Sequence, residues 1–403
     1  MKNKQLLYLI SSDFISSVGS SIQAAALAIY ILDMTKSSQL FSLMLASAIL
    51  PRVIFGPFFG VLTDWFNKKK ILLLLNVLNF SVICLVTIFL DKSNLVLLFA
   101  MVICLGLLAA CYSPASAGTI KLIASGEQEL SQAYTVMSFT DSIQAVVAPL
   151  IGASVYSLMG IKTVLLCNGL SFILSNILIY LLKNDYFKQV SQTKTLKQFA
   201  SDFVKGFQYM KGNQLLWHTA ICVMILNFFS IPLFSVGNGV VAKLIFKVSN
   251  TQFSLIESVG IVAAFFSPFI FSLIKAKFSL ARLFILSMQI LASLVLILGI
   301  ISGLNGYDYR YALYLGFIFC VSFVEGILNI AIMTLLQTKI EAQFSGRVNG
   351  ILTTMFIGLV PVGQVIYGYL FTVLPVQVPF VITSLVYVGV IYLYKKGLKA
   401  VSN

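Results

Sequence analysis

Twelve apolar stretches of about 20 residues constrain the fold of this chain more than any other feature, because a helix of that length crosses the hydrocarbon core of a membrane. They occupy residues 8–31, 39–62, 71–90, 95–118, 132–157, 164–182, 217–241, 251–274, 283–303, 311–336, 348–373 and 379–394. A membrane β-barrel would instead alternate polar and apolar residues along strands of about ten residues. Runs such as 71–75 and 291–301 are apolar on every face. The sequence therefore predicts an all-α membrane protein with twelve transmembrane helices.

Composition excludes several classes of protein. Hydrophobic residues make up 59% of the chain and charged residues 10%, whereas a soluble domain carries about 25% charged residues. A cytosolic enzyme, a disordered protein and a nucleic-acid-binding protein are therefore not expected, despite the net charge of +14. The only histidine is His218, so a multi-histidine metal site is excluded. We expect no metal, no cofactor and no nucleic-acid partner, and no Walker A motif is present for ATP hydrolysis.

The distribution of lysine and arginine predicts the orientation of the chain in the membrane. With the N-terminus placed inside, the inner segments hold 20 basic residues and the outer loops hold 6. Cytoplasmic loops carry the excess of basic residues in membrane proteins. Both termini are therefore expected in the cytoplasm.

The chain divides into two halves of six spans, 1–182 and 217–403, joined by a connection at 183–216. Apolar residues recur in this connection at steps of three and four, from Leu196 to Met210, between lysines. This pattern indicates an amphipathic helix on the inner leaflet, or alternatively one that binds a partner. The two halves also repeat each other weakly, since the motifs at 55–58 and 148–149 recur about 211 residues later at 266–269 and 360–361. Parallel halves of this kind are typical of transporters.

The most specific motif follows the second span, at residues 60–70. It contains Gly60, Asp64, Lys68, Lys69 and a third lysine. The glycine would allow close helix packing, the aspartate would accept bonds from a helix N-terminus or a basic side chain in one conformation only, and the lysines would hold the loop on the anionic leaflet. We interpret it as a conformational gating motif.

This motif resembles the signature between spans 2 and 3 of the major facilitator superfamily. The segment Leu336-Gln337-Thr338-Lys339, followed by Gly346-Arg347-Val348, resembles a branch that includes macrolide-efflux proteins and siderophore exporters, and adds Arg347 to the expected gating residues. The resemblance implies two pseudo-symmetric six-helix bundles and transport by alternating access. Two departures weaken the case for antiport. Span 4 has no arginine, and the span 5 motif is degenerate, although Pro149 and Gly152 remain to favour a kink and close packing.

Five ionisable residues fall inside the predicted spans, where charge is costly and by default functional. They are the proton-coupling candidates Glu325, Asp141, Arg52, Asp13 and Glu257.

Each of these residues has a competing structural interpretation. Arg52 and Asp141 are expected to form an ion pair. Glu325 is expected to be the principal proton-linked residue, because the resemblance places its span on the central cavity; Asp141 is its rival, and a bond to Ser322 is the structural alternative. Asp13 could instead cap the first helix, and Glu257 could reach water on the outer side.

These features predict a secondary transporter of the bacterial inner membrane, not an enzyme. It would export an amphipathic, drug-like or macrolide-like molecule in exchange for protons. Its other expected partners are membrane lipids, and it is expected to act as a monomer. The alternatives are export or import of a native metabolite such as a siderophore, a membrane-embedded enzyme or lipid flippase, and a membrane receptor that does not transport.

Overall fold

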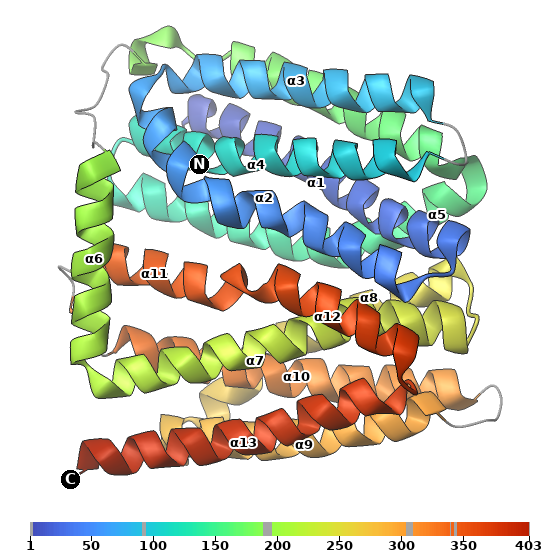
Figure 1. Cartoon of the computed structure of the whole chain (residues 1–403). Coiled ribbons are helices and arrows are strands. Elements are labelled where there is room, and N and C mark those ends of the chain that lie inside the picture. Colours follow the sequence, from blue (N-terminus) through green and yellow to red (C-terminus); the bar gives the residue numbers. More distant parts are fainter. Residues whose placement is uncertain are drawn as a thin grey trace. The chain divides into compact units, whose positions relative to one another are not determined.

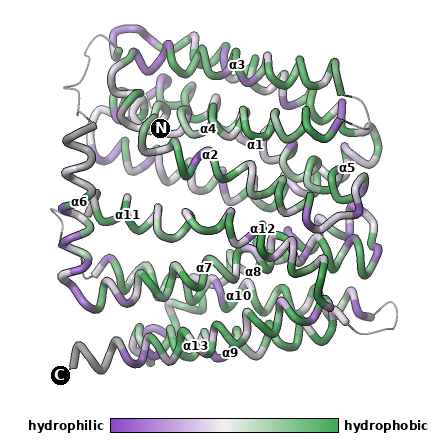
Figure 2. Tube along the Cα trace, in the orientation of Figure 1, coloured by the Kyte–Doolittle hydropathy of each residue, from purple (hydrophilic) through white to green (hydrophobic). Residues whose placement is uncertain are grey.

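The computed structural model describes residues 3–90, 94–187, 196–303, 309–338, 340–341 and 345–402. Every regular element within these residues is helical (Figure 1). Eleven helices are long and apolar enough to cross a membrane. Hydrophobic residues run along most of the length of these helices (Figure 2). The predicted all-α membrane class is confirmed.

The first half of the chain contains α1 (Lys4–Thr35), α2 (Ser38–Trp65), α3 (Lys68–Phe89), α4 (Leu95–Ile123), α5 (Glu127–Tyr180) and the 3-10 helix η1 (Asn184–Phe187). The predicted connection holds α6 (Leu196–Gly212). The second half contains α7 (Gln214–Gly239), the π-helix η2 (Val240–Ile245), α8 (Asn250–Ile274), α9 (Leu280–Gly303), α10 (Tyr309–Gln337), α11 (Ser345–Gly358), α12 (Val360–Val373) and α13 (Gln377–Ser402).

Helix α5 contains two spans, because the chain reverses direction inside it at Gly160 (Figure 1). Gly160 has φ 79°, a conformation that favours glycine. Both ends of α5 lie beside the start of α1: the side-chain amide of Asn3 donates to Glu129 Oε2 at 3.2 Å, and the Lys183 amide donates to Gln5 Oε1 at 2.7 Å. The connection predicted between the fifth and sixth spans is thus reduced to one non-helical residue. Because α5 counts as two spans, the eleven candidate helices of the described residues provide twelve spans.

The helices form two compact units. Unit 1 comprises residues 1–34 and 47–199, and unit 2 comprises residues 35–46 and 200–403. The beginning of α2 therefore groups with unit 2, where Ser38 Oγ donates to the Gly368 carbonyl at 3.2 Å. The sequence analysis placed all of residues 1–182 in one half and did not predict that the beginning of α2 packs with unit 2. Hydropathy locates a membrane span, but it does not identify the helices against which the span packs.

Within unit 1, α3 packs against both α4 and α5. Leucine and isoleucine side chains of α1, α3, α4 and α5 form a buried core near the N-terminal end of α1, including Leu6, Leu9, Leu72 and Ile179. Within unit 2, α10 packs between α8 and α9, and α7 packs against α12 and α13. Each unit thus buries apolar side chains between helices and leaves apolar faces exposed, as a membrane-spanning bundle requires.

Two glycines, one in each half of the chain and each shortly after a proline, bring helix backbones into close approach. A Cβ atom at Gly152 of α5 would lie 2.7 Å from the carbonyl oxygen of Ile22 on α1. A Cβ atom at Gly363 of α12 would lie 2.5 Å from the carbonyl oxygen of Phe228 on α7. Small residues let membrane helices pack this closely. The packing expected at Gly152, three residues after Pro149 inside α5, is therefore present.

We expect Gly152→Ala to lower the stability of the purified protein by about 1–3 kcal/mol, because the added methyl group overpacks the α1–α5 contact. The measurement is the thermal unfolding midpoint in detergent. Gly56→Ala in α2 is the matched control, since a Cβ at Gly56 would meet no atom of the described residues within 4 Å. Equal midpoints for the two variants would contradict the close-packing assignment.

Candidate functional site

The acidic side chain with the most complete set of partners is Asp13, in the interior of α1. Its Oδ1 accepts a hydrogen bond from Tyr112 Oη at 2.6 Å, and its Oδ2 accepts one from Ser116 Oγ. Both donors lie on α4, and Asp13 is only 9% exposed. Asp13 forms no ion pair with a lysine or arginine of the described residues. The helix-capping alternative for Asp13 is therefore wrong, because both carboxylate oxygens bind a neighbouring helix.

Asp141 of α5 lies close enough to Asp13 for the two carboxylates to interact electrostatically. Polar contacts continue along the same pair of helices. Ser17 Oγ donates to Gln144 Oε1 at 2.6 Å, and Gln144 Nε2 donates to Ser21 Oγ at 2.8 Å. The structure thus brings two predicted candidates, Asp13 and Asp141, together on a polar stripe between α1 and α5.

The predicted ion pair between Arg52 and Asp141 is wrong for this conformation. Both side chains are exposed, and no hydrogen bond or ion pair joins them within the part of the chain that the structure describes. Arg52 projects from α2, whereas Asp141 is beside Asp13. Opposite charge and similar depth in one half of the chain do not determine the direction in which each helix points its side chain.

Glu325 of α10 is half-buried. It has no hydrogen bond or ion pair with a described residue, so the alternative of a bond to Ser322 is not observed. Tyr387 of α13 lies near enough to interact with it electrostatically. The Tyr387 hydroxyl is 2.5 Å from Ser230 Oγ on α7. Glu325 therefore lies near the Tyr387–Ser230 pair, and neither hydroxyl donates a hydrogen bond to its carboxylate.

Glu257 of α8 has partners that the sequence analysis missed. Asn238 Nδ2 donates to Glu257 Oε1 at 3.1 Å, and the buried Tyr314 Oη donates to Asn238 Oδ1 at 2.9 Å. Asn238 lies two residues before the π-helical turn η2, and such turns frequently accompany functional sites. Glu257 is therefore held by a buried amide, where the sequence analysis allowed it to reach outer water. The sequence signal that could have indicated this partner is Asn238, a polar residue inside an apolar stretch.

The predicted gating motif is only partly described. The side chains of Asp64 in α2 and Arg347 in α11 lie outside the described residues. A Cβ atom at Gly60 would meet no described atom within 4 Å, so the close packing expected at Gly60 is not seen among the residues that the structure describes. Asn67, at the end of the motif, caps α3 by accepting a hydrogen bond from the Lys70 amide at 3.1 Å. The motif therefore includes the cap and the first turn of the third span.

Lys68 and Lys69 are both buried, at 7% exposure, whereas Lys70 is exposed. Lys69 Nζ donates to the carbonyl oxygens of Tyr180 at 2.9 Å and Leu182 at 2.5 Å, and to Asn184 Oδ1 at 2.9 Å. The ammonium group thus satisfies carbonyls at the C-terminal end of α5, where a cation is favoured. The expectation that Lys68 and Lys69 rest on the lipid headgroups is wrong, because both side chains are buried, and the Lys69 contact joins α3 to α5.

We expect Lys69→Met to lower stability by about 2 kcal/mol or more, because it removes charge-assisted hydrogen bonds and leaves buried carbonyls unsatisfied. The thermal unfolding midpoint of the purified protein measures this change. Lys70→Met removes the neighbouring, exposed lysine and should leave the midpoint within about one degree of the wild-type value, as surface substitutions usually do. A Lys69→Met variant as stable as Lys70→Met would refute the capping assignment.

Comparison with known families gives one match over most of the chain. The family described as Major Facilitator Superfamily matches residues 9–362. An uncharacterised MFS-type transporter of Bacillus subtilis, YfiS, is 25% identical over 361 residues, covering 86% of this chain and 82% of that protein. Macrolide efflux protein A of Streptococcus pyogenes is 24% identical over 173 residues, which is 42% of each chain.

Solved structures resemble the whole fold. A bacterial homologue of the iron transporter ferroportin, in an inward-facing state, superposes with a TM-score of 0.76 at 12% identity and covers 98% of this chain and 99% of its own. The nucleoside transporter NupG superposes with a TM-score of 0.73 at 12% identity and covers 99% of this chain and 100% of its own. At these identities the likeness concerns the fold alone.

Proposed function

The chain belongs to the Major Facilitator Superfamily of transporters, and from this premise we propose that it exports an amphipathic small molecule in exchange for protons. Alternating access of the two halves would move the solute. The proposed location is the bacterial inner membrane, with both termini in the cytoplasm and one chain as the functional unit. The excess of basic residues in the inner segments supports this orientation.

The observation that carries the proton-coupling proposal is the environment of Asp13. Its carboxylate is buried among hydroxyl donors from Tyr112 and Ser116, with no lysine or arginine paired to it in the described residues. Hydroxyl groups can donate to an ionised carboxylate and can also accept from a protonated one. The site therefore accommodates both charge states, and a change in its access to water would let it take up and release a proton during the cycle.

Two features support an amphipathic solute and export. The partial similarity to a macrolide efflux protein covers 42% of the chain. In addition, the motif that recurs in both halves carries exposed phenylalanines, Phe55 and Phe58 in α2 and Phe266 and Phe269 in α8, and aromatic pairs lie there. Phe55 and Phe59 of α2 have ring centroids 6.2 Å apart, and Phe265 and Phe269 of α8 have centroids 6.1 Å apart. Aromatic surfaces of this kind suit apolar solutes that carry a few polar groups.

The experiment uses the full chain in everted membrane vesicles, whose interior is made acidic and which receive radiolabelled erythromycin as the probe. We expect time-dependent accumulation that a protonophore abolishes. Accumulation that resists the protonophore would reject proton coupling. If a panel of amphipathic drugs, added to the same vesicles, gives no accumulation while a siderophore does, the solute class moves to native metabolites. Movement of fluorescent lipid alone would indicate a flippase.

A further inference from the structure

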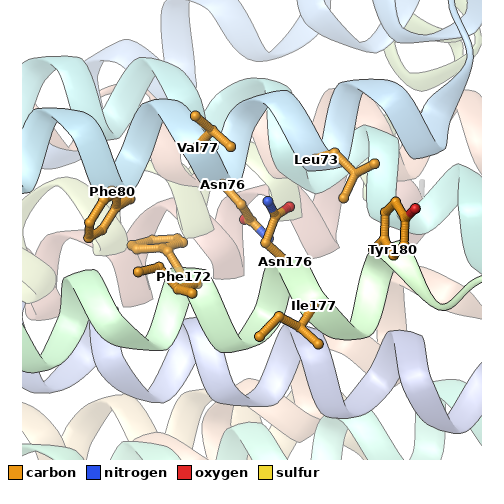
Figure 3. Close-up of a pocket in the computed structure, with 9 residues that line it drawn as sticks. Leu73, Asn76, Val77, Phe80, Phe172, Asn176, Ile177 and Tyr180 are labelled. Carbon is orange, nitrogen blue, oxygen red and sulfur yellow. The ribbon is translucent and has the colours of Figure 1, made fainter.

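A groove of about 290 Å³ lies in unit 1 between α3 and the second half of α5 (Figure 3). Its size is near the lower end for cavities that hold small organic ligands, about 300–1,000 Å³. The lining residues are Leu73, Asn76, Val77 and Phe80 of α3 and Phe172, Ile173, Asn176, Ile177 and Tyr180 of α5. The groove takes no part in the acidic sites described above.

Two amide oxygens in this apolar groove lack a hydrogen bond. Asn76 Oδ1 and Asn176 Oδ1 are both buried, and neither has a partner in the described residues. Figure 3 shows the two amides in the middle of the groove, between the rings of Phe80 and Phe172 at one end and Tyr180 at the other. A buried acceptor without a donor costs about 1–3 kcal/mol, so two in one groove require an explanation.

The orientation of Asn76 is fixed by a hydrogen bond. Its Nδ2 donates to Ser175 Oγ at 2.9 Å, and Ser175 Oγ is in turn 2.7 Å from Ser12 Oγ on α1. The amide nitrogen is therefore used inside the bundle, and the oxygen is left for the groove. A ligand that satisfies both amides must supply two hydrogen-bond donors.

The mouth of the groove is apolar and exposed. Val77 is 48% exposed, Ile177 is 53% exposed and Tyr180 is 72% exposed. In a chain that spans a membrane, an exposed face made of such side chains contacts lipid. A ligand would therefore enter from the hydrocarbon and must itself dissolve there.

We propose that this groove is a binding site for a membrane-dissolved amphipathic diol, whose two hydroxyl groups donate to Asn76 Oδ1 and Asn176 Oδ1. The alkyl part lies between Phe80, Phe172 and Val77. A saturated acyl chain would fill the groove and leave both oxygens unpaired. This site is independent of the proposed transport reaction, because it requires neither a transported solute nor a proton gradient.

The test uses the full chain in nanodiscs of phosphatidylcholine and phosphatidylglycerol, with a diazirine-bearing decane-1,2-diol as the photoreactive probe. Mass spectrometry should locate saturable labelling in residues 73–80 and 172–180. Unlabelled decane-1,2-diol should compete best, 1-decanol less well and decane least. Each lost neutral hydrogen bond is expected to weaken competition by about two- to tenfold.

Asn176→Leu and Asn76→Leu each remove one acceptor. In either variant, the diol should compete no better than 1-decanol. Asn79→Leu is the matched control: Asn79 is also buried on α3, but its amide donates to its own helix at Leu75 O, at 2.8 Å, and does not line the groove. The advantage of the diol should persist in Asn79→Leu.

Thermal unfolding without diol provides a second measurement. Replacing an unsatisfied amide by leucine should leave the midpoint of Asn176→Leu equal to or above that of the wild type. Equal competition by decane and the diol would overturn the proposal in favour of an acyl-chain groove. A lowered midpoint without saturable labelling would overturn it in favour of structural water bonded to the two amides.

Discussion

Asp13→Asn is expected to abolish accumulation of solute driven by a pH gradient while retaining exchange of labelled for unlabelled solute. Asparagine has the size of the protonated acid and can still bond to Tyr112 and Ser116, but it cannot release a proton. The measurement is transport of erythromycin by proteoliposomes with an imposed pH gradient, followed by exchange without a gradient. We expect uphill transport to fall at least tenfold, because the proton gradient can bias the two conformations only through a group that binds a proton differently in each. Exchange needs no gradient and should remain within about twofold of the wild type.

The control for this variant is Glu127→Gln, which neutralises an exposed carboxylate at the start of α5. It should transport normally. Tyr112→Phe gives a graded test, because it removes one donor and leaves the carboxylate in place. It should shift the pH at which uphill transport is half-maximal without abolishing transport. Retention of uphill transport by Asp13→Asn, together with its loss in Asp141→Asn, would assign the proton to Asp141.

The spans and their number could be predicted from the sequence because the membrane imposes a length and a composition on each helix. The weak internal repeat also indicated where helices pack closely. Pro149 recurs as Pro361, each proline is followed within three residues by a glycine, Gly152 or Gly363, and both glycines permit a close backbone approach in the structure. The reversal at Gly160 falls inside the connection predicted at residues 158–163. The reduction of that connection to one residue with positive φ was not predicted, because such a residue leaves almost no mark on hydropathy.

The partners of the buried polar groups could not be predicted, because they depend on how each helix is rotated about its axis. Asp13 and Tyr112 are 99 residues apart in the sequence and meet only when α1 and α4 pack. Lys69 and Lys70 are adjacent and alike in type, yet one binds the end of α5 and the other is exposed. Helix rise estimates how deep a residue lies in the membrane. It does not identify the residue of the neighbouring helix that it contacts at that depth, because this depends on helix packing.

Glu325→Gln is expected to remove uphill, proton-driven transport and to retain exchange, by a different physical route from Asp13. Glu325 lies half-buried in α10 with no described hydrogen-bond or ion-pair partner, although Tyr387 is nearby. A carboxylate buried without a donor or a counter-ion costs several kcal/mol in its charged form, and protonation removes that cost. The charged form should therefore favour the conformation in which Glu325 reaches water, and glutamine should remove this preference.

The same proteoliposomes measure both variants, so the roles of the two acids can be separated. We expect uphill transport to fall at least tenfold in Glu325→Gln, with exchange preserved and with Glu127→Gln again unaffected. Tyr387→Phe should have a smaller effect, since its hydroxyl pairs with Ser230 at 2.5 Å and is not bonded to Glu325. If Glu325→Gln still concentrates erythromycin against its gradient while Asp13→Asn does not, Glu325 lies outside the coupling path. In that case a carboxylate with two preorganised hydroxyl donors is sufficient to carry the proton through the cycle.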